Sequence, residues 1–338
     1  MGLIRLLPRP RGAPSAPDPS PDPEPLETPS EPVAVSEPVP EPEAPVAADS
    51  VEPVDVPPAE QPAVGLTPSG TLPAGAATSV IALANQKGGV AKTTTTLNLG
   101  VALREMGHRV LLVDLDPQGN LTMSQGLNPD VIERSMFDVL VHKIPISEVI
   151  ERREVDLAVA SIDLAGAELA LSALIGRERS LEKALVEVRN AYDYILIDTP
   201  PSLGLLTINA FVAATGVIVP VQCEYLALRG LVQLENTLAM VRENLNPNVG
   251  VEGIVPTMFD GRTLHSREAI EILEENFGDL VYRTRIRKTV RYAEAPVKGS
   301  SVLKYDPTGA AAEAYRELAR EIVALKEAED GAQARKHA

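Results

Sequence analysis

Short, continuous apolar runs recur along the chain from about residue 80 onward, and longer amphipathic stretches separate them. Apolar runs of this kind, bounded by turn residues, predict strands buried on both faces, and the amphipathic stretches predict helices. The predicted strands are 80–84, 109–114, 155–160, 194–198, 216–221 and 251–257, with a short strand near Val281. The predicted helices are 95–105, 164–174, 180–189, 228–244, 266–276 and 309–327. This alternation predicts an α/β fold with a twisted, mostly parallel sheet and helices on both of its faces.

The first 75 residues differ in composition from the rest of the chain. They hold 20 of the 30 prolines and no aromatic residue, and their 3 basic and 12 acidic residues contribute −9 of the net charge of −16. Such a segment cannot bury enough apolar surface to offset the entropy lost on ordering. We therefore expect a disordered, Pro/Glu/Ala-rich acidic tail at 1–75, one folded domain at 78–329 and a flexible C-terminal tail at 330–338.

Cysteine content and hydropathy exclude several classes of protein. The single cysteine, Cys223, excludes a disulfide framework and a cysteine-based metal site within one subunit, and the four histidines show no ligand spacing. The sequence has no run of about 18 apolar residues, so no membrane-spanning helix is predicted. The apolar stretch after Met1 is too short for a signal peptide. We expect a cytoplasmic protein that does not bind a membrane.

The segment between the first predicted strand and the first predicted helix carries the most specific chemical signal. Residues 85–94 read N-Q-K-G-G-V-A-K-T-T, a variant of the phosphate-binding loop G-x-x-x-x-G-K-[ST]. Glycines let the backbone N–H groups point at phosphates, and the helix N-terminus adds partial positive charge. Lys92 is expected to reach the β- and γ-phosphates, and the hydroxyl of Thr93 to hold Mg²⁺. The expected nucleotide-binding residues are Lys87, Gly88, Gly89, Val90, Ala91, Lys92, Thr93 and Thr94.

Two departures make this loop unusual. Gln86 and Ala91 occupy the two glycine positions of the general pattern, and Lys87 adds a second lysine. A Cβ penalises positive φ, so Ala91 is expected to strain the loop or to slow hydrolysis.

Aspartates follow two of the predicted strands. Asp198 ends the strand 194–198 in the position of a Walker B carboxylate, and Asp114 and Asp116 follow the strand 109–114. Ligands of parallel sheets lie at the carboxyl ends of the strands, where the phosphate loop is also expected. Nucleotide hydrolysis needs Mg²⁺ between protein and phosphates, and an oriented water molecule. We expect Thr93 to hold Mg²⁺ through its hydroxyl, and Asp198 to bind it directly or through water.

The Lys-Gly-Gly-x-x-Lys-Thr form of the loop resembles the deviant Walker A loop of the ParA/MinD ATPases. Three further segments resemble the Soj/ParA branch: Q-C-E-Y-L-A-L-R-G at 222–230, F-D-G-R-T at 259–263 and R-Y-A-E-A-P at 291–296. In the last of these, Ala293 stands where the family has serine. Together the matches cover about Ser79 to Leu325, so the folded domain is identified as a P-loop NTPase of the deviant Walker A type.

This resemblance implies an Mg²⁺-dependent ATPase with weak intrinsic activity that segregates a chromosome or plasmid. In such proteins two subunits enclose two ATP molecules, and Lys87 would touch the phosphates bound to the other subunit. Asp116 would orient or activate the attacking water, so the implied catalytic residues are Lys87, Lys92 and Asp116. Asp114 would lie near the outer shell of the metal, so the metal residues become Thr93, Asp114 and Asp198. The implied partners are a second copy of the chain, non-specific double-stranded DNA and a ParB-like protein that stimulates hydrolysis. The implied location is the nucleoid of a bacterial cytoplasm.

Bulk charge argues against binding nucleic acid, so a local patch is required. Residues 76–338 contain 28 basic and 35 acidic residues, a net charge of −7. The segment 281–291 contains five basic residues and no acidic one, which suits salt-dependent phosphate contacts. The same pattern also fits an edge strand protected by its charges. The DNA-binding candidates are Arg283, Arg285, Arg287, Lys288 and Arg291, with Arg229 and Arg262 added by the resemblance.

Three alternatives stay open at this point. The first is a MinD-like or ParA-like positioning ATPase that acts on a membrane or a protein cluster; the residues after Leu325 offer no bulky apolar face for a membrane. The second is an iron–sulfur or metabolic relative, which the lone Cys223 disfavours. The third is a nucleotide switch that scarcely hydrolyses ATP, which Ala91 would favour. The sequence does not identify the cargo.

Overall fold

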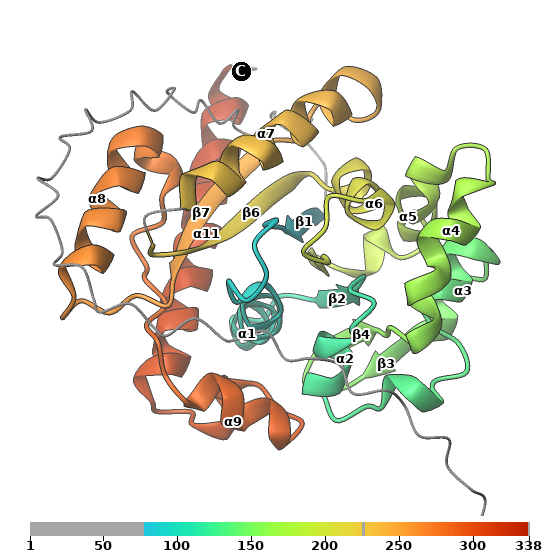
Figure 1. The fold of residues 1–338 in the computed structure, drawn as a ribbon, viewed down its shortest axis with the longest axis horizontal. Coiled ribbons are helices and arrows are strands. Elements are labelled where there is room, and N and C mark those ends of the chain that lie inside the picture. The colour runs from blue at the N-terminus through green and yellow to red at the C-terminus, as the bar shows by residue number, and fades with distance from the viewer. Residues whose placement is uncertain (1–77, 225–226, 337–338) are drawn as a thin grey trace, which may run out of the picture. The chain divides into compact units, whose positions relative to one another are not determined.

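The computed structural model of the protein describes residues 78–224 and 227–336. The predicted acidic tail at 1–75 lies outside the described residues. A seven-stranded sheet with the order β3-β4-β2-β5-β1-β6-β7 forms the centre of the described part (Figure 1). Its strands are β1 (Ser79–Leu83), β2 (Val110–Asp114), β3 (Ile150–Arg152), β4 (Asp156–Ala158), β5 (Tyr194–Asp198), β6 (Gly216–Gln222) and β7 (Val251–Thr257). The pairings are parallel except that β3 is antiparallel to β4. The predicted α/β fold is confirmed.

Helices cover the sheet. They are α1 (Lys92–Glu105), α2 (Asn120–Ser124), α3 (Met136–Val141), α4 (Ala167–Ser172), α5 (Ser180–Leu185), α6 (Leu205–Ala213), α7 (Ala227–Asn244), α8 (Leu264–Phe277), α9 (Arg291–Val297), α10 (Val302–Tyr305) and α11 (Ala310–Lys336). Successive side chains of a strand point to opposite faces of a sheet. Accordingly, Val80 and Ala82 of β1 pack in the core beneath α3 to α7, and Ile81 and Leu83 pack in the core beneath α1 and α11. Both faces of the sheet are therefore buried in an apolar core, which explains why the strands read as continuous apolar runs.

The strand register brings the acidic residues to the loop. Asp114 at the end of β2 pairs with Asp198 at the end of β5, and Asp198 also pairs with Leu83 at the end of β1. The phosphate loop leaves β1 directly after Leu83. The phosphate loop and the two carboxylates therefore lie together at the carboxyl ends of the central strands β2, β5 and β1.

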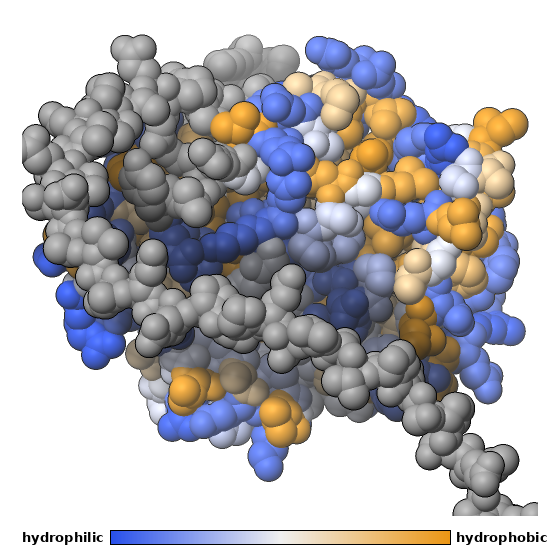
Figure 2. Space-filling view, in the orientation of Figure 1, coloured by the Kyte–Doolittle hydropathy of each residue, from blue (hydrophilic) through white to orange (hydrophobic). Residues whose placement is uncertain are grey.

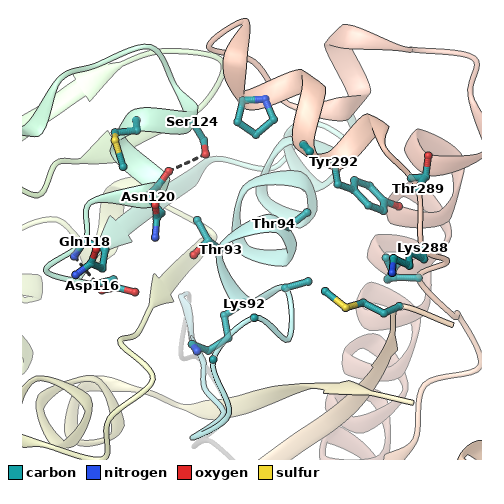
Figure 3. Close-up of a pocket in the computed structure, with 18 of the residues that line it drawn as sticks. Lys92, Thr93, Thr94, Asp116, Gln118, Asn120, Ser124, Lys288, Thr289 and Tyr292 are labelled. Atoms are coloured by element: carbon teal, nitrogen blue, oxygen red, sulfur yellow. Dashed lines mark hydrogen bonds between the residues drawn. The ribbon is translucent and has the colours of Figure 1, made fainter. Parts of the chain in front are cut away.

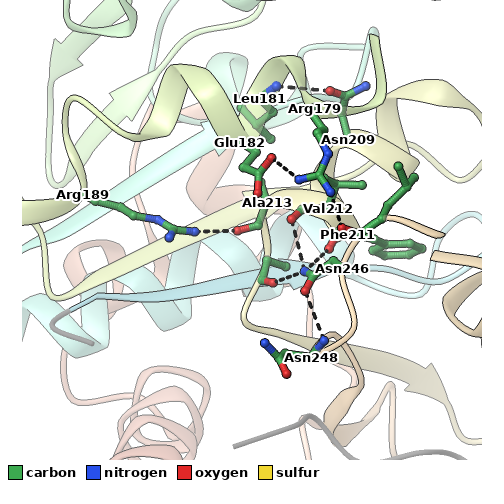
Figure 4. Close-up of polar contacts among 12 residues, drawn as sticks. Arg179, Leu181, Glu182, Arg189, Asn209, Phe211, Val212, Ala213, Asn246 and Asn248 are labelled. Atoms are coloured by element: carbon green, nitrogen blue, oxygen red, sulfur yellow. Dashed lines mark hydrogen bonds and ion pairs between the residues drawn. The ribbon is translucent and has the colours of Figure 1, made fainter. Parts of the chain in front are cut away.

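Helix α6 follows β5 and is fixed at its C-terminal end by side chains from other elements (Figure 4). The last carbonyls of a helix lack intrahelical partners. Here the side-chain amide of Asn246 donates to the carbonyls of Phe211 (3.1 Å), Val212 (3.1 Å) and Ala214 (2.9 Å). Arg189 donates to the carbonyl of Ala213 (3.0 Å). These hydrogen bonds fix the C-terminal end of α6 to the segments that contain Arg189 and Asn246.

Several predicted elements need correction. No strand forms near Val281; a single bridge joins it to Ile254, because the carboxylate of Glu321 accepts the N–H groups of Arg283 (2.7 Å) and Thr284 (3.0 Å) in place of a strand partner. Helix α6 was not predicted because its sequence is almost wholly apolar and has no amphipathic period. The short elements β3, α2, α3, α9 and α10 were also missed.

The ends of several helices differ from prediction: α4 (167–172) and α5 (180–185) are shorter than predicted, whereas α1, α8 (264–277) and α11 are longer. Helix α1 begins at Lys92, three residues before the predicted start at Thr95, because the N–H of Thr95 already donates to the carbonyl of Ala91 (2.9 Å). Helix α11 continues to Lys336, so residues 330–336 are helical where a flexible tail was predicted. The Ala, Gln, Arg and Lys residues of this stretch are strong helix formers, and they outweigh the cost of about 1 kcal/mol for one glycine.

Candidate nucleotide-binding site

The loop after β1 ends in a backbone suited to binding an anion. Gly89 has φ of 74° and Ala91 has φ of 69°, so both lie in the left-handed region. Thr95 makes the first intrahelical hydrogen bond of α1, which leaves the N–H groups of Lys92, Thr93 and Thr94 without helical acceptors. These groups and the helix dipole together form an anion site. The expectation that Ala91 has a strained conformation is confirmed.

A cavity of about 810 Å³ opens over this loop. Its floor contains Lys92, Thr93 and Thr94, and Asp116, Gln118 and Asn120 line one wall (Figure 3). The opposite wall is formed by Lys288, Thr289 and Tyr292, and Met258 is also among the lining residues. The volume falls within the range of about 300–1,000 Å³ that is usual for small-molecule and cofactor sites.

Lys92 is buried, and its ammonium donates to the carbonyl of Asn85 (3.2 Å). Burial lowers its pKa, and the charges of Asp198 and Asp116 oppose that effect. Phosphates placed in the cavity would add the opposite charge that a buried ammonium requires. The environment of Lys92 therefore favours an anionic ligand.

The three aspartates have different surroundings. Asp114 is fully buried and accepts hydrogen bonds from the hydroxyl (2.7 Å) and N–H (2.9 Å) of Thr122 and from the N–H of Asp116 (3.2 Å). Burial raises the pKa of Asp114 to about 7. Burial and the charge of Asp114 raise the pKa of Asp198 well above its ordinary value. Asp116 lines the cavity, where its Oδ1 accepts from the N–H of Gln118 (3.0 Å).

A magnesium ion fits Asp198 better than it fits Asp114. Within the described residues, Oδ2 of Asp198 is buried and has no hydrogen-bond partner, and Oδ1 accepts a long hydrogen bond from Thr96 (3.4 Å). The hydroxyl of Thr93 also interacts with this carboxylate and acts to lower its pKa. Both oxygens of Asp114 are occupied by hydrogen bonds from the protein. The described residues contain no cluster of three or more His, Cys, Asp or Glu side chains that would hold a metal by themselves. Mg²⁺ usually takes one or two carboxylates and completes its shell with phosphates and water, so the residues present suit it.

Lys87 does not line this cavity. Its ammonium pairs with Glu224 (2.6 Å) and donates to Gln222 (3.0 Å), which is the last residue of β6. Both charged side chains are about half exposed, with exposed fractions of 45% and 52%. Lys87 therefore points away from the nucleotide cavity of its own chain.

The predicted DNA-binding residues fall into two groups. Some are held by carboxylates: Arg262 forms a bidentate pair with Asp260 (2.9 and 2.8 Å), Arg285 pairs with Glu274 (2.9 Å) and Arg291 pairs with Glu294 (2.8 Å). Arg283, Arg287 and Lys288 are exposed and have no ion pair among the described residues. Arg229 belongs to α7, but its side chain lies outside the described residues.

Residues that the sequence analysis missed shape the loop and the cavity. Asn85 accepts the N–H of Lys87 (3.0 Å) and donates to the carbonyl of Pro220 (2.8 Å), which ties the loop to β6. Its position two residues before Lys87 is the signal of an Asx turn. Tyr292 and Met258 line the cavity from segments far along the chain, and no local pattern indicates that placement.

A parallel sheet, a phosphate loop at the end of its first strand and carboxylates on the neighbouring strands define a P-loop nucleoside triphosphatase. A family model described as an AAA domain matches residues 78–251. The chain is 48% identical over 248 residues to the sporulation initiation inhibitor protein Soj of Bacillus subtilis, covering 72% of this chain and 98% of that protein. It is 44% identical over 249 residues to the chromosome partitioning protein ParA of Caulobacter vibrioides, and the match covers 72% of this chain and 93% of that protein.

Solved structures give the same fold. A structure described as cobyrinic acid a,c-diamide synthase from Mycobacterium smegmatis, with bound ADP and magnesium, is similar with a TM-score of 0.65 and 43% identity over 73% of this chain and 94% of that one. The cell division ATPase MinD of Pyrococcus furiosus is similar with a TM-score of 0.60 and 25% identity, and the match covers 73% of this chain and 99% of that one. The chain belongs to the ParA/MinD family of partitioning ATPases, as its resemblance to the Soj/ParA branch predicted. Within the described residues, no helix combines the length and the apolar character that crossing a bilayer requires.

Proposed function

We propose that the protein is an ATP-dependent partition protein of the Soj/ParA type. An ATP-bound dimer binds DNA without sequence preference, and ATP hydrolysis stimulated by a ParB-like partner releases it. The observation that carries this proposal is the cavity in which Lys92, the free N–H groups of α1 and Asp116 converge. The similarity to Soj and ParA supports chromosome or plasmid segregation as the process, with the nucleoid of a bacterial cytoplasm as the location.

The chain's own residues supply binding and orientation for hydrolysis. Lys92 and the N–H groups of Lys92 to Thr94 hold the phosphates of ATP. Thr93 and Asp198 hold Mg²⁺, with Asp114 behind them, and the bound ion neutralises charge on the phosphates. Asp116 lies on the cavity wall and is the carboxylate that orients the attacking water or takes its proton. Bound ADP and magnesium in the M. smegmatis structure support ATP and Mg²⁺ as the ligands.

Lys87 serves the dimer in this proposal. Its ammonium leaves Glu224 and reaches the phosphates bound to the second subunit. An ion pair between half-exposed side chains contributes about 0–1 kcal/mol, so its release costs little compared with a contact to ATP. The direction of Lys87, away from its own cavity, supports a role outside its own subunit.

The protein surface supports contacts with other proteins as well. Several large apolar side chains in and around α4 and α5 are exposed, among them Ile162, Leu169, Ile175 and Val186. Figure 2 shows apolar surface on the side of the molecule where α4 and α5 are labelled in Figure 1. Clustered exposed apolar side chains mark interaction surfaces, which suits a protein that binds a second copy and a ParB-like partner.

ATP turnover tests this proposal. Hydrolysis is measured for the protein alone, with double-stranded DNA, and with DNA and a ParB-like protein. The proposal predicts slow turnover alone and an increase with both additions. Turnover that neither addition changes would contradict it, and would favour the nucleotide switch or a positioning role on another cargo.

A second candidate rests on the M. smegmatis structure, which is described as a synthase. ATP consumption that depends on cobyrinic acid, and not on DNA, would support that activity. A third is the positioning of a protein cluster or a membrane-bound cargo, for which the MinD fold is the supporting observation. Recruitment of the ATP-bound protein to lipid vesicles, without binding to DNA, would support it.

A further inference from the structure

The turn between β2 and α2 places two polar side chains on the same wall of the nucleotide cavity. Asp116 and Asn120 both line this wall. The turn is closed by the N–H of Gly119, which donates to the carbonyl of Asp116 (2.8 Å). Gly119 has φ of 60°, and a Cβ there would lie 2.7 Å from the ring of Pro129, so a residue with a side chain would strain the turn. The backbone therefore fixes Asp116 and Asn120 relative to each other.

The carboxylate of Asp116 has one oxygen held and one oxygen free. Oδ1 accepts the N–H of Gln118 (3.0 Å), whereas Oδ2 accepts no hydrogen bond from the described residues. The backbone N–H of Asp116 donates to Asp114 (3.2 Å), which fixes the residue from its other side. The free oxygen is thus available to accept a hydrogen bond from a molecule in the cavity.

The side-chain amide of Asn120 also has room for a new partner. The backbone carbonyl of Asn120 accepts the hydroxyl of Ser124 (2.7 Å), but within residues 78–224 and 227–336 the side-chain amide has no hydrogen-bond partner. The residue is exposed, and its amide offers one acceptor oxygen and two donor hydrogens to the cavity. In Figure 3 this side chain points toward Thr93, whereas the side chain of Gln118 lies on the far side of Asp116.

The space between this wall and the loop suits the γ-phosphate of ATP. Lys92 and Thr93, which bind the phosphates and Mg²⁺ in the proposed function, line the floor. A water molecule that attacks the γ-phosphorus in line with the leaving group would lie beyond this phosphate, against the wall of Asp116 and Asn120. A single carboxylate oxygen accepts only one of the two O–H groups of that water. The water would remain free to turn about this one hydrogen bond, so a second acceptor is needed to orient it.

We propose that Asn120 is a further catalytic residue, and that its Oδ1 accepts the second O–H group of the attacking water. The inference rests on the proposed ATPase function and adds a residue to the same site. The water oxygen forms a bond to the γ-phosphorus, and one of its protons passes to Asp116. The bond between this phosphorus and the bridging oxygen breaks, and its electron pair leaves with ADP. The second proton of the water stays on the product phosphate, and Asn120 holds it during the attack.

Single-turnover hydrolysis tests the assignment, because it measures the chemical step separately from product release. Protein in excess over ATP is mixed with Mg²⁺, double-stranded DNA and a ParB-like protein, and the formation of phosphate is followed in time. Asn120→Ala is expected to slow this step roughly 5- to 10-fold, as for one hydrogen bond to the reacting water. The affinity for ATP and the Tm are expected to equal those of the wild type, since the exposed side chain makes no hydrogen bond within the described residues.

A double-mutant cycle separates a contact with the water from a structural effect. In an Asp116→Ala background the water has lost its carboxylate, so Asn120→Ala is expected to cause little further loss. A structural effect would give the same loss in both backgrounds and would overturn the assignment. Asn190→Ala is the matched control, because Asn190 is an exposed asparagine outside the cavity. It is expected to give the wild-type rate in both backgrounds.

Three other results would also contradict the account. A wild-type rate in Asn120→Ala would overturn the assignment, and a loss in Gln118→Ala instead would assign the second contact to that amide. Weaker ATP binding by Asn120→Ala, equal to its loss of rate, would show that the amide holds the nucleotide and not the water, which likewise overturns the assignment. A wild-type protein that forms no phosphate under these conditions would instead contradict the proposed ATPase function itself.

Discussion

Replacing Ala91 with glycine tests how the chain stores strain in its phosphate loop. Ala91 caps helix α1 with φ of 69° and ψ of 33°, a left-handed conformation that costs a residue with a Cβ about 1–2 kcal/mol. Glycine adopts this conformation freely, but it gives the unfolded chain more freedom, which costs about 0.4–1 kcal/mol. The difference predicts that Ala91→Gly stabilises the protein by about 1 kcal/mol. For a domain of this size, that corresponds to a rise in Tm of about 2–4 °C.

The matched control is Ala173→Gly. Ala173 is exposed, lies at the end of α4 and has φ of −84°, so glycine relieves no strain there and only adds freedom to the unfolded chain. Thermal unfolding of the ligand-free proteins, followed by circular dichroism, is expected to show opposite shifts for the two variants. A fall in Tm for Ala91→Gly equal to that for Ala173→Gly would show that the loop does not hold Ala91 in a strained conformation.

Three further predictions concern the carboxylates and Lys87. Because the folded pKa of Asp114 is about 7 against an ordinary 3.8, the stability that its protonation gives is complete below pH 3.8 and lost as pH rises through 7. Between pH 5 and pH 8 about two pH units lie below the folded pKa, so unfolding in denaturant is expected to show the wild type losing about 2–3 kcal/mol relative to Asp114→Asn, and equal pH dependence would contradict it. Asp116→Ala is expected to keep ATP binding but to reduce ATP turnover at least about 100-fold. Normal turnover would show that another residue orients the attacking water. Lys87→Ala is expected to stay monomeric with ATP in sedimentation experiments, and an ATP-dependent dimer would exclude its role across the subunit interface.

The sequence predicted the sheet and the loop because their signals are local. Strands such as β1 and β5 are buried on both faces, so every residue in them is apolar and the run stands out. The loop is a contiguous motif, and Lys92 and Thr93 lie in the first turn of α1, where the motif requires them. Asp114 and Asp198 are paired because each is the last residue of its strand and the two strands, β2 and β5, are adjacent and parallel.

The remaining features depend on contacts between distant segments. No local pattern shows that Glu321, near the end of the chain, replaces a strand partner for Arg283. The segment 281–291 contains no acidic residue, yet Arg285 and Arg291 find carboxylates on other elements, so charge counted along the sequence overstates the free positive charge. Tyr292 closes the nucleotide cavity from a helix some 200 residues beyond the loop. Such placements follow from tertiary packing, which hydrophobic periodicity does not encode.

Binding to non-specific double-stranded DNA with ATP, with ADP and without nucleotide, at two salt concentrations, tests the partition mechanism most directly. The mechanism predicts that the protein binds DNA in the presence of ATP but not with ADP or without nucleotide. The higher salt concentration is expected to weaken this binding, because contacts with backbone phosphates supply the affinity. Binding that is equal in all three nucleotide states, or absent from all of them, would contradict it.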